Sequence, residues 1–260
     1  MATPNTRFGD SDYNSSNYRD FRPDYGQALY DRIYAFHDTQ PQGQGYDVAV
    51  DVGTGTGQVA TALAKRFAAV KGFDSSEAML QSAEPGHNIT YRAAPAEKLP
   101  AEDHSVDLVT VGTALHWFDT DRFMEEVKRI LKPGGTLACF GYHPPQCPED
   151  PTVTEAVRHL YHDVLGTYWD PRAEHIMSQY RDVAFPFTTV ERHTSPPEPF
   201  CITKRHTSES LRALCRTWSG YKTWKERHPR ALDCVDNMQL PPDDVPLDLV
   251  WPSHLVLCKP

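Results

Sequence analysis

The fold of this chain is decided by one short stretch, Val48-Ala49-Val50-Asp51-Val52-Gly53-Thr54-Gly55-Thr56-Gly57. Its first half is rich in valine, which is typical of a strand buried on both faces of a parallel sheet. Its second half is a glycine turn, and the next ten residues place Val59, Leu63 and Phe67 on one helical stripe. A strand, a glycine turn and a helix in this order predict the start of a nucleotide-binding α/β unit, because glycine lets the backbone turn sharply and approach a ligand.

The ligand of the glycine turn is a separate question. The dinucleotide-binding pattern G-x-G-x-x-G needs a third glycine at position 58, where this chain has Gln58. The pattern here is G-x-G-x-G, led by Asp51. A second predicted strand ends at Asp74, at the distance from the turn where an acidic side chain can accept hydrogen bonds from ribose hydroxyls. In the alternative interpretation, Asp74 caps a helix over residues 75–83 and the turn is only a tight connection.

Strand and helix signals alternate through the first half of the chain. A helix is predicted over residues 25–37, and further strands over residues 89–92, residues 106–111 and the segment after Gly135. This alternation predicts a parallel sheet with helices on both faces. Beyond residue 141 the sequence predicts helices over 152–164, 171–180 and 208–218, a strand over 188–194, and late strands at the sheet edge over 247–251 and 254–258.

Four blocks over residues 48–140 follow one another in a set order. They are the glycine turn, Gly72-Phe73-Asp74-Ser75-Ser76-Glu77-Ala78-Met79-Leu80, Ala96-Glu97-Lys98-Leu99-Pro100 and Arg129-Ile130-Leu131-Lys132-Pro133-Gly134-Gly135-Thr136-Leu137. In this order the blocks resemble the class I S-adenosylmethionine (SAM) dependent methyltransferases. The resemblance implies an α/β fold: a Rossmann-like, doubly wound, mostly parallel seven-stranded sheet with a helical cap inserted after strand five.

The resemblance also implies the cofactor, SAM, and the residues that bind it. In this family the glycine turn holds the methionine end of SAM, the second block holds the ribose, and the third lies beside the adenine ring. The residues of the core predicted to bind SAM are Asp51, Gly53, Thr54, Gly55, Gly57, Asp74, Ser75, Met79, Ala96, Glu97 and Thr113.

The N-terminal segment Tyr18-Arg19-Asp20-Phe21-Arg22-Pro23-Asp24-Tyr25 is similar to one in the trans-aconitate methyltransferase-like branch, where it precedes the first helix and covers the SAM site. On that resemblance, Tyr18 and Arg22 are predicted to bind SAM. An arginine can pair with the SAM carboxylate, and an aromatic ring can lie against the sulfonium. The alternative is a surface arginine and a packed tyrosine.

The acceptor of the methyl group is predicted to lie beyond the carboxyl end of strand four, where Thr113-Ala114-Leu115-His116-Trp117-Phe118 follows. His116 can take a proton from an acceptor or orient it; a packing or capping histidine is the alternative. The run Thr217-Trp218-Ser219-Gly220-Tyr221 again resembles the trans-aconitate branch. The predicted substrate-binding residues are His116, Trp117, Trp218 and Tyr221.

The predicted function is a SAM-dependent methyltransferase that acts on a small-molecule acceptor, by O-methylation of a carboxylate or hydroxyl. The resembled branch methylates small carboxylic acids, but an aromatic acceptor also fits the aromatic residues after position 141. Two alternatives stay open: a SAM-binding protein without methyl transfer, and an NAD-dependent oxidoreductase, which Gln58 disfavours. No metal is expected, because the cofactor itself carries the reactive group.

Composition limits the other partners. The net charge of −9 and the lack of a basic stripe argue against nucleic acid. No apolar run is long enough for a membrane span. The N-terminus lacks a signal-peptide pattern, and the six cysteines form no C-x-x-C pair, so free thiols in a cytoplasmic monomer or homodimer are expected.

The predicted organisation of the single domain is an N-terminal lid and helix over 1–40, a SAM-binding core over 41–141, a substrate cap over 142–235 and final strands over 236–260.

Overall fold

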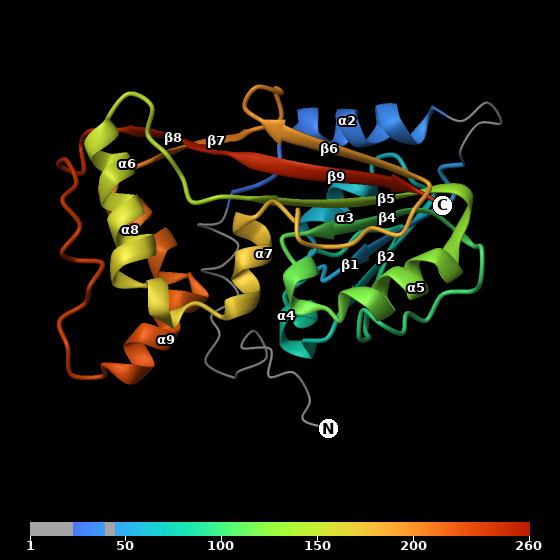
Figure 1. Ribbon diagram of the computed structural model, residues 1–260, viewed down its shortest axis with the longest axis horizontal. Helices are drawn as coiled ribbons and strands as arrows, with labels where there is room; N and C mark the ends of the chain where they lie inside the picture. The colour runs from blue at the N-terminus through green and yellow to red at the C-terminus, as the bar shows by residue number, and fades with distance from the viewer. Residues whose placement is uncertain (1–22, 40–44) are drawn as a thin grey trace.

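The computed structural model describes residues 23–39 and 45–260 of the chain. Its main sheet has seven strands in the order β3-β2-β1-β4-β5-β9-β6 (Figure 1). The first five of these run parallel, β9 is antiparallel to β5, and β6 is antiparallel to β9. The predicted seven-stranded, mostly parallel sheet is therefore confirmed. The strands are β1 Val48–Val52, β2 Ala69–Asp74, β3 Ile89–Ala93, β4 Val106–Gly112, β5 Leu131–Tyr142, β6 Thr189–Ser195 and β9 Ser253–Lys259.

Both faces of the central strands are buried, as the valine-rich sequence of β1 requires. Val50 and Val52 pack in the cluster that contains helix α5 (Thr120–Ile130), whereas Ala49 packs in the cluster of α2 (Gln27–His37) and α3 (Gln58–Leu63). Alternate residues of a strand point to opposite faces. The run of apolar residues in β1 is therefore explained by helices on both sides of the sheet.

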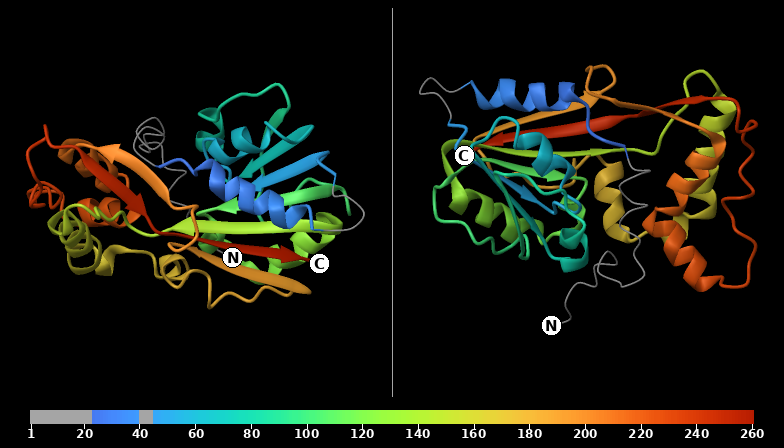
Figure 2. Two further views of the ribbon diagram at one scale, coloured as in Figure 1. Left: turned by 90° about the horizontal axis from the view of Figure 1, so that it is seen from above. Right: turned by 180° about the vertical axis from the view of Figure 1, so that it is seen from behind.

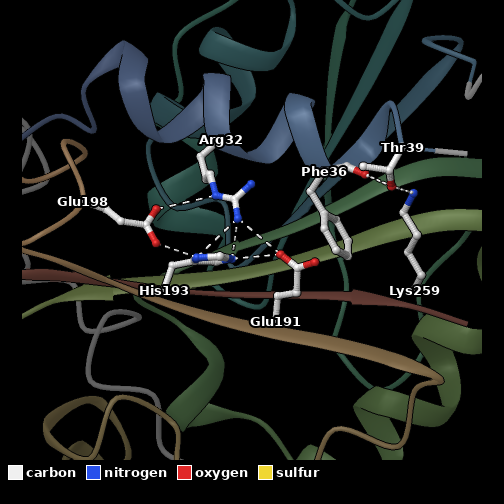
Figure 3. Close-up of polar contacts among 7 residues, drawn as sticks. All are labelled: Arg32, Phe36, Thr39, Glu191, His193, Glu198 and Lys259. Atoms are coloured by element: carbon white, nitrogen blue, oxygen red, sulfur yellow. Dashed lines mark hydrogen bonds and ion pairs between the residues drawn. The ribbon is translucent and has the colours of Figure 1, made fainter.

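Helix α2 is fixed to the last strands of the sheet at two places, which Figure 3 shows. Near its middle, Arg32 forms ion pairs with Glu191 (3.3 Å) and Glu198 (3.6 Å). At its carboxyl end, the buried ammonium of Lys259 donates to the hydroxyl of Thr39 (3.0 Å), as Figure 3 shows, and to the carbonyl of His37 (3.2 Å). A positive charge is favourable at this end of a helix. Strands β6 and β9 thus determine where the N-terminal helix lies.

The segment after β5 contains helices, as the sequence predicts for a cap, and also strands, of which the one predicted over residues 188–194 is present as β6. Strand β6 returns to the main sheet, and β7 (Ile202–His206) pairs with β8 (Leu247–Trp251) in a separate two-stranded sheet. Neither of the late strands is at the edge of the main sheet, where the sequence predicts them. Strand β9 lies one strand in, between β5 and β6, and β8 belongs to the small sheet. The α-helices of this part are α6 Pro151–Arg158, α7 Glu174–Met177, α8 Ser208–Arg216 and α9 Ser219–Arg227. Helix α6 continues as a π-helical turn over His159–Val164.

Helices α6, α8 and α9 form a group beyond one end of the main sheet, and α7 lies between this group and the sheet (Figures 1 and 2). The sheet end that faces them is the carboxyl end of the parallel strands, where ligands of open α/β sheets bind. Across residues 23–39 and 45–260, no helix combines the length and the apolar character needed to cross a membrane.

Candidate functional site

The glycine turn after β1 depends on left-handed backbone at all three glycines. The φ angles are +69° at Gly53, +55° at Gly55 and +84° at Gly57. A Cβ at Gly53 would lie 2.5 Å from the Cβ of Ala114, and one at Gly57 would lie 2.2 Å from the hydroxyl of Tyr91. At Gly55 the nearest atom is the end of a flexible methionine side chain, 3.3 Å away. Gly53 and Gly57 are therefore required by the packing of the turn, whereas Gly55 borders open space.

Asp74, the last residue of β2, ties this turn to the next helix. Its carboxylate accepts a hydrogen bond from the backbone N–H of Gly55 (2.9 Å) and another from that of Ser76 (2.9 Å). Ser76, not Asp74, caps the next helix, α4 (Glu77–Gln81). Ser76 directly precedes α4, and its side chain accepts a hydrogen bond from the N–H of Met79. Burial raises the pKa of Asp74, and the backbone hydrogen bonds oppose that change. Each carboxylate oxygen can accept a further hydrogen bond.

A cavity that we call the main cavity opens beside Asp74 and the glycine turn. Its other walls are mostly apolar, with Pro95 and Phe118 among them, so it can hold a flat ring as well as the hydroxyls of a sugar. Eight of the residues predicted to bind SAM line it: Gly53, Gly55, Asp74, Ser75, Met79, Ala96, Glu97 and Thr113.

A smaller cavity, the loop cavity, lies on the other side of the turn and is lined by Asp51, Thr54 and Tyr25, among others. Asp51 is almost fully buried and accepts a hydrogen bond from the hydroxyl of Thr110 (2.8 Å). Burial raises the pKa of its carboxyl to about 7. Gly57 lines neither cavity and instead precedes α3 as its N-cap residue. Tyr18 and Arg22, also predicted to bind SAM, lie outside the described residues.

The raised pKa of Asp51 predicts a pH dependence of stability. The ordinary value in an unfolded chain is about 3.9, so the folded chain binds more protons between about pH 4 and pH 7. Stability contributed by the protonated carboxyl is then present at low pH and is lost as the pH rises through about 7. Between pH 5 and pH 7.5 the wild type should lose on the order of 2–3 kcal/mol relative to Asp51→Asn, measured by urea unfolding. Equal pH slopes in the two proteins would contradict this prediction.

A third cavity, the aromatic cavity, lies between the carboxyl ends of β4 and β5 and the helices beyond them. It is lined by three of the four predicted substrate residues, His116, Trp117 and Trp218. No lysine or arginine occurs among the described residues of its lining. The lining residues that sequence reasoning did not select as substrate sites include Tyr142, His143, Tyr161, Trp169 and Trp251.

Tyr221, the fourth predicted substrate residue, does not line the aromatic cavity. Its hydroxyl donates to the carboxylate of Asp233 (2.7 Å), and its ring stacks on Trp224 at a centroid distance of 6.2 Å. The resemblance of residues 217–221 predicts Tyr221 beside Trp218 at the acceptor, but Trp218 is extended (ψ 138°) and precedes helix α9. The two side chains are therefore not on one helical surface.

His143 is a second histidine of the aromatic cavity that the sequence analysis missed. It follows β5 directly, and His116 lies four residues beyond the end of β4, so the rule that ligands bind beyond strand ends was the available signal. Burial lowers the pKa of His143, and the nearest ring is the buried His254 at 5.7 Å. His143 is thus neutral near pH 7.

The main and loop cavities together fit SAM. The main cavity combines a carboxylate acceptor with apolar walls, as a ribose and a flat base require, and the loop cavity adds the carboxyl of Asp51 for a cationic amino acid end. The space at Gly55 lies between these two cavities and would be narrowed by any side chain.

Comparisons with known proteins agree with this assignment. Residues 50–139 match the family described as "Methyltransferase domain". A methyltransferase of Dictyostelium discoideum is 30% identical over 258 residues, which cover 94% of this chain and 92% of that protein. A solved type II methyltransferase from Anaeromyxobacter dehalogenans is 30% identical with a TM-score of 0.77, over 92% of this chain and 98% of that one. A phosphoethanolamine N-methyltransferase of Haemonchus contortus, solved with SAM, shares the fold at 20% identity and a TM-score of 0.55, over 100% of this chain and 60% of that one.

Fold, cavity chemistry and near full-length similarity point to one family. The chain belongs to the class I SAM-dependent methyltransferases, and SAM is its cofactor.

Proposed function

We propose that this methyltransferase transfers the methyl group of SAM to a hydroxyl of a small, flat, largely apolar molecule in the aromatic cavity. The observation that carries the proposal is the lining of that cavity: tryptophan and tyrosine rings, two histidines, and no lysine or arginine among its described residues. A bound carboxylate would keep its negative charge and need a cationic partner. A hydroxyl needs only a group that accepts its proton.

Under this proposal SAM occupies the main and loop cavities. Asp74 binds the ribose hydroxyls, the glycine turn faces the methionine part, and the amino group of that part lies toward Asp51. Met79, Ala96 and Glu97 lie beside the adenine ring, and Tyr18 and Arg22, outside the described residues, are kept as further SAM-binding residues. The support is the joint lining of the two cavities by these core residues.

SAM supplies a methyl group on a positively charged sulfur, so the chemistry left to the chain is modest. The aromatic walls exclude water and align the acceptor, and alignment alone contributes roughly 7–11 kcal/mol at best. His116, beside Trp117 at the end of β4, accepts the hydroxyl proton. The segment over residues 142–235 selects the acceptor, because it supplies Trp169 and Trp218.

A small carboxylic acid is the second candidate acceptor. It is favoured by the resemblance of residues 18–25 and 217–221 to the trans-aconitate methyltransferase-like branch. In this case no proton needs to be removed.

Three test acceptors that share one ring system and differ in their functional group distinguish the candidate acceptors. The enzyme is incubated with methyl-labelled SAM and 2-naphthol, 2-naphthoic acid or 2-naphthylamine, which present different groups on one ring system. We expect label on 2-naphthol as a base-stable ether. A base-labile ester of the acid would favour the second candidate, and label on the amine would contradict O-methylation. If SAM binds but none of a wider panel of alcohols, acids and amines is labelled, the protein binds SAM without methyl transfer.

A further inference from the structure

The three cavities meet at one side chain. The main and aromatic cavities share Thr113 and Trp117, and the aromatic and loop cavities share Thr113 and Tyr142. Among the described residues, Thr113 alone lines all three. It follows β4 directly, at the sheet end where the ligands lie.

The backbone of Thr113 is held in an unusual conformation. Its φ is +53°, in the left-handed region that β-branched residues rarely adopt. Its N–H donates to the carbonyl of Phe140 (2.8 Å), so strand β5 fixes its position. Strained residues of this kind cluster at ligand-binding and active sites, where the surrounding structure enforces them.

The hydroxyl of Thr113 is paired with that of Tyr25, at an oxygen–oxygen distance of 2.5 Å. The Tyr25 ring packs edge-on against Phe140 (4.7 Å) and lies near Tyr142 (5.9 Å). The chain before it is also fixed, because Gln58 of α3 donates to Asp24 (2.6 Å). Two oxygen atoms from distant parts of the chain are therefore held together at the meeting point of the cavities.

The position of this pair relates it to the reacting methyl group. SAM joins an adenosine part and a methionine part through the methylated sulfur, and these parts fit the main and loop cavities. The methyl group must also face the acceptor in the aromatic cavity. The methyl group must therefore lie where the main, loop and aromatic cavities meet, and that place borders Thr113.

We propose that the hydroxyl of Thr113, held by its pairing with the hydroxyl of Tyr25, contacts the transferable methyl group and recognises it. Positive charge on sulfur polarises the methyl C–H groups, and oxygen atoms are suitable acceptors for such C–H groups. Thr113 contacts the methyl group, and Tyr25 is a positioning residue that orients the threonine hydroxyl. The inference relies on SAM as the cofactor and not on the identity of the acceptor.

The test compares ligands with and without the methyl group, with no acceptor present. Isothermal titration calorimetry gives the dissociation constants of SAM and of S-adenosylhomocysteine, which lacks the methyl group and the charge. In Tyr25→Phe, and in Thr113→Val, which keeps the branched shape, the constant for SAM should rise about three- to tenfold. The constant for S-adenosylhomocysteine should stay within about twofold.

Two further measurements sharpen the test. Tyr46→Phe is the matched control, since it removes a tyrosine hydroxyl that donates to Asp38 (2.7 Å) remote from the cavities, and both constants should remain those of the wild type. The double variant Tyr25→Phe/Thr113→Val should lose no more preference for SAM than the larger single effect, because the hydroxyls act as a pair.

The proposal is overturned if folded Tyr25→Phe keeps the wild-type ratio of the two constants, or if both ligands weaken equally. Tyr25→Phe keeps the aromatic packing, so it remains informative if Thr113→Val does not fold. Thermal melting checks the fold of each variant. Failure here leaves the hydroxyl-acceptor proposal standing, and failure with the naphthol series does not affect this result.

Discussion

Replacing Asp74 by alanine is expected to raise the dissociation constant of SAM by about 10- to 150-fold. This corresponds to about 1.5–3 kcal/mol, the range for hydrogen bonds to a charged group. Two effects combine. The ribose loses its carboxylate acceptor, and the N–H groups of Gly55 and Ser76 lose the side chain that joins the glycine turn to α4. Calorimetric titration of SAM measures the change, with thermal melting as the check that the variant is folded.

The two effects can be separated with ligands that differ only in the ribose. The wild type should prefer 5′-methylthioadenosine to its 2′,3′-dideoxy analogue, and Asp74→Ala should lose that preference. A preference that survives in the variant would place the ribose away from Asp74. A weaker affinity for both ligands with the preference intact would mean that the carboxylate acts only by holding the turn.

Replacing His116 by alanine should have the largest effect on turnover. With a hydroxyl acceptor, we expect kcat to fall by roughly 10²–10⁴, because general-base catalysis contributes that much, while SAM affinity stays nearly unchanged. With a carboxylate acceptor the same substitution should act mainly on KM, since no proton is removed. Steady-state kinetics with the acceptor found in the panel, together with SAM titration, distinguish the two cases.

The matched control for His116→Ala is His143→Gln, because both histidines line the aromatic cavity. The ring of His143 rests against the buried His254, and its burial favours a role as part of the wall. We therefore expect less than about a tenfold loss of kcat from His143→Gln. A large loss that follows His143 instead of His116 would show that the proton acceptor has been assigned to the wrong histidine.

Sequence reasoning recovers the core of the fold because its signals are local. The run of valines in β1, the three glycines and Asp74 lie within 27 residues, from Val48 to Asp74, and each acts through backbone geometry or strand burial. Glycine is favoured where φ is positive, and the three glycines of the turn show that preference in the sequence. The start of a nucleotide-binding α/β unit follows from such local signals, whereas the seven-stranded sheet, the cofactor class and most of the predicted lining of the main cavity came from the family resemblance.

The part after β5 was harder to predict because its elements are stabilised by distant partners. Strand β7 carries the polar run Thr203-Lys204-Arg205 and exists because it pairs with β8, more than 40 residues later. Tyr221 was expected beside Trp218 in the substrate site, yet helix α9 begins only after Trp218 and the tyrosine hydroxyl donates to Asp233. Neither outcome can be read from the periodicity of the sequence, since tertiary packing overrides local preference in short polar segments.

The sequence by itself thus determined the strand, glycine turn and acidic residue that make this chain a SAM-binding α/β protein. Only the tertiary structure decided how the cavities meet. Thr113 and Tyr25 are 88 residues apart, and their hydroxyls are paired because β5 fixes Thr113 while α2, held by Arg32 and Lys259 to the last strands, fixes Tyr25. Contacts between such distant segments depend on the completed sheet, and no local pattern encodes them.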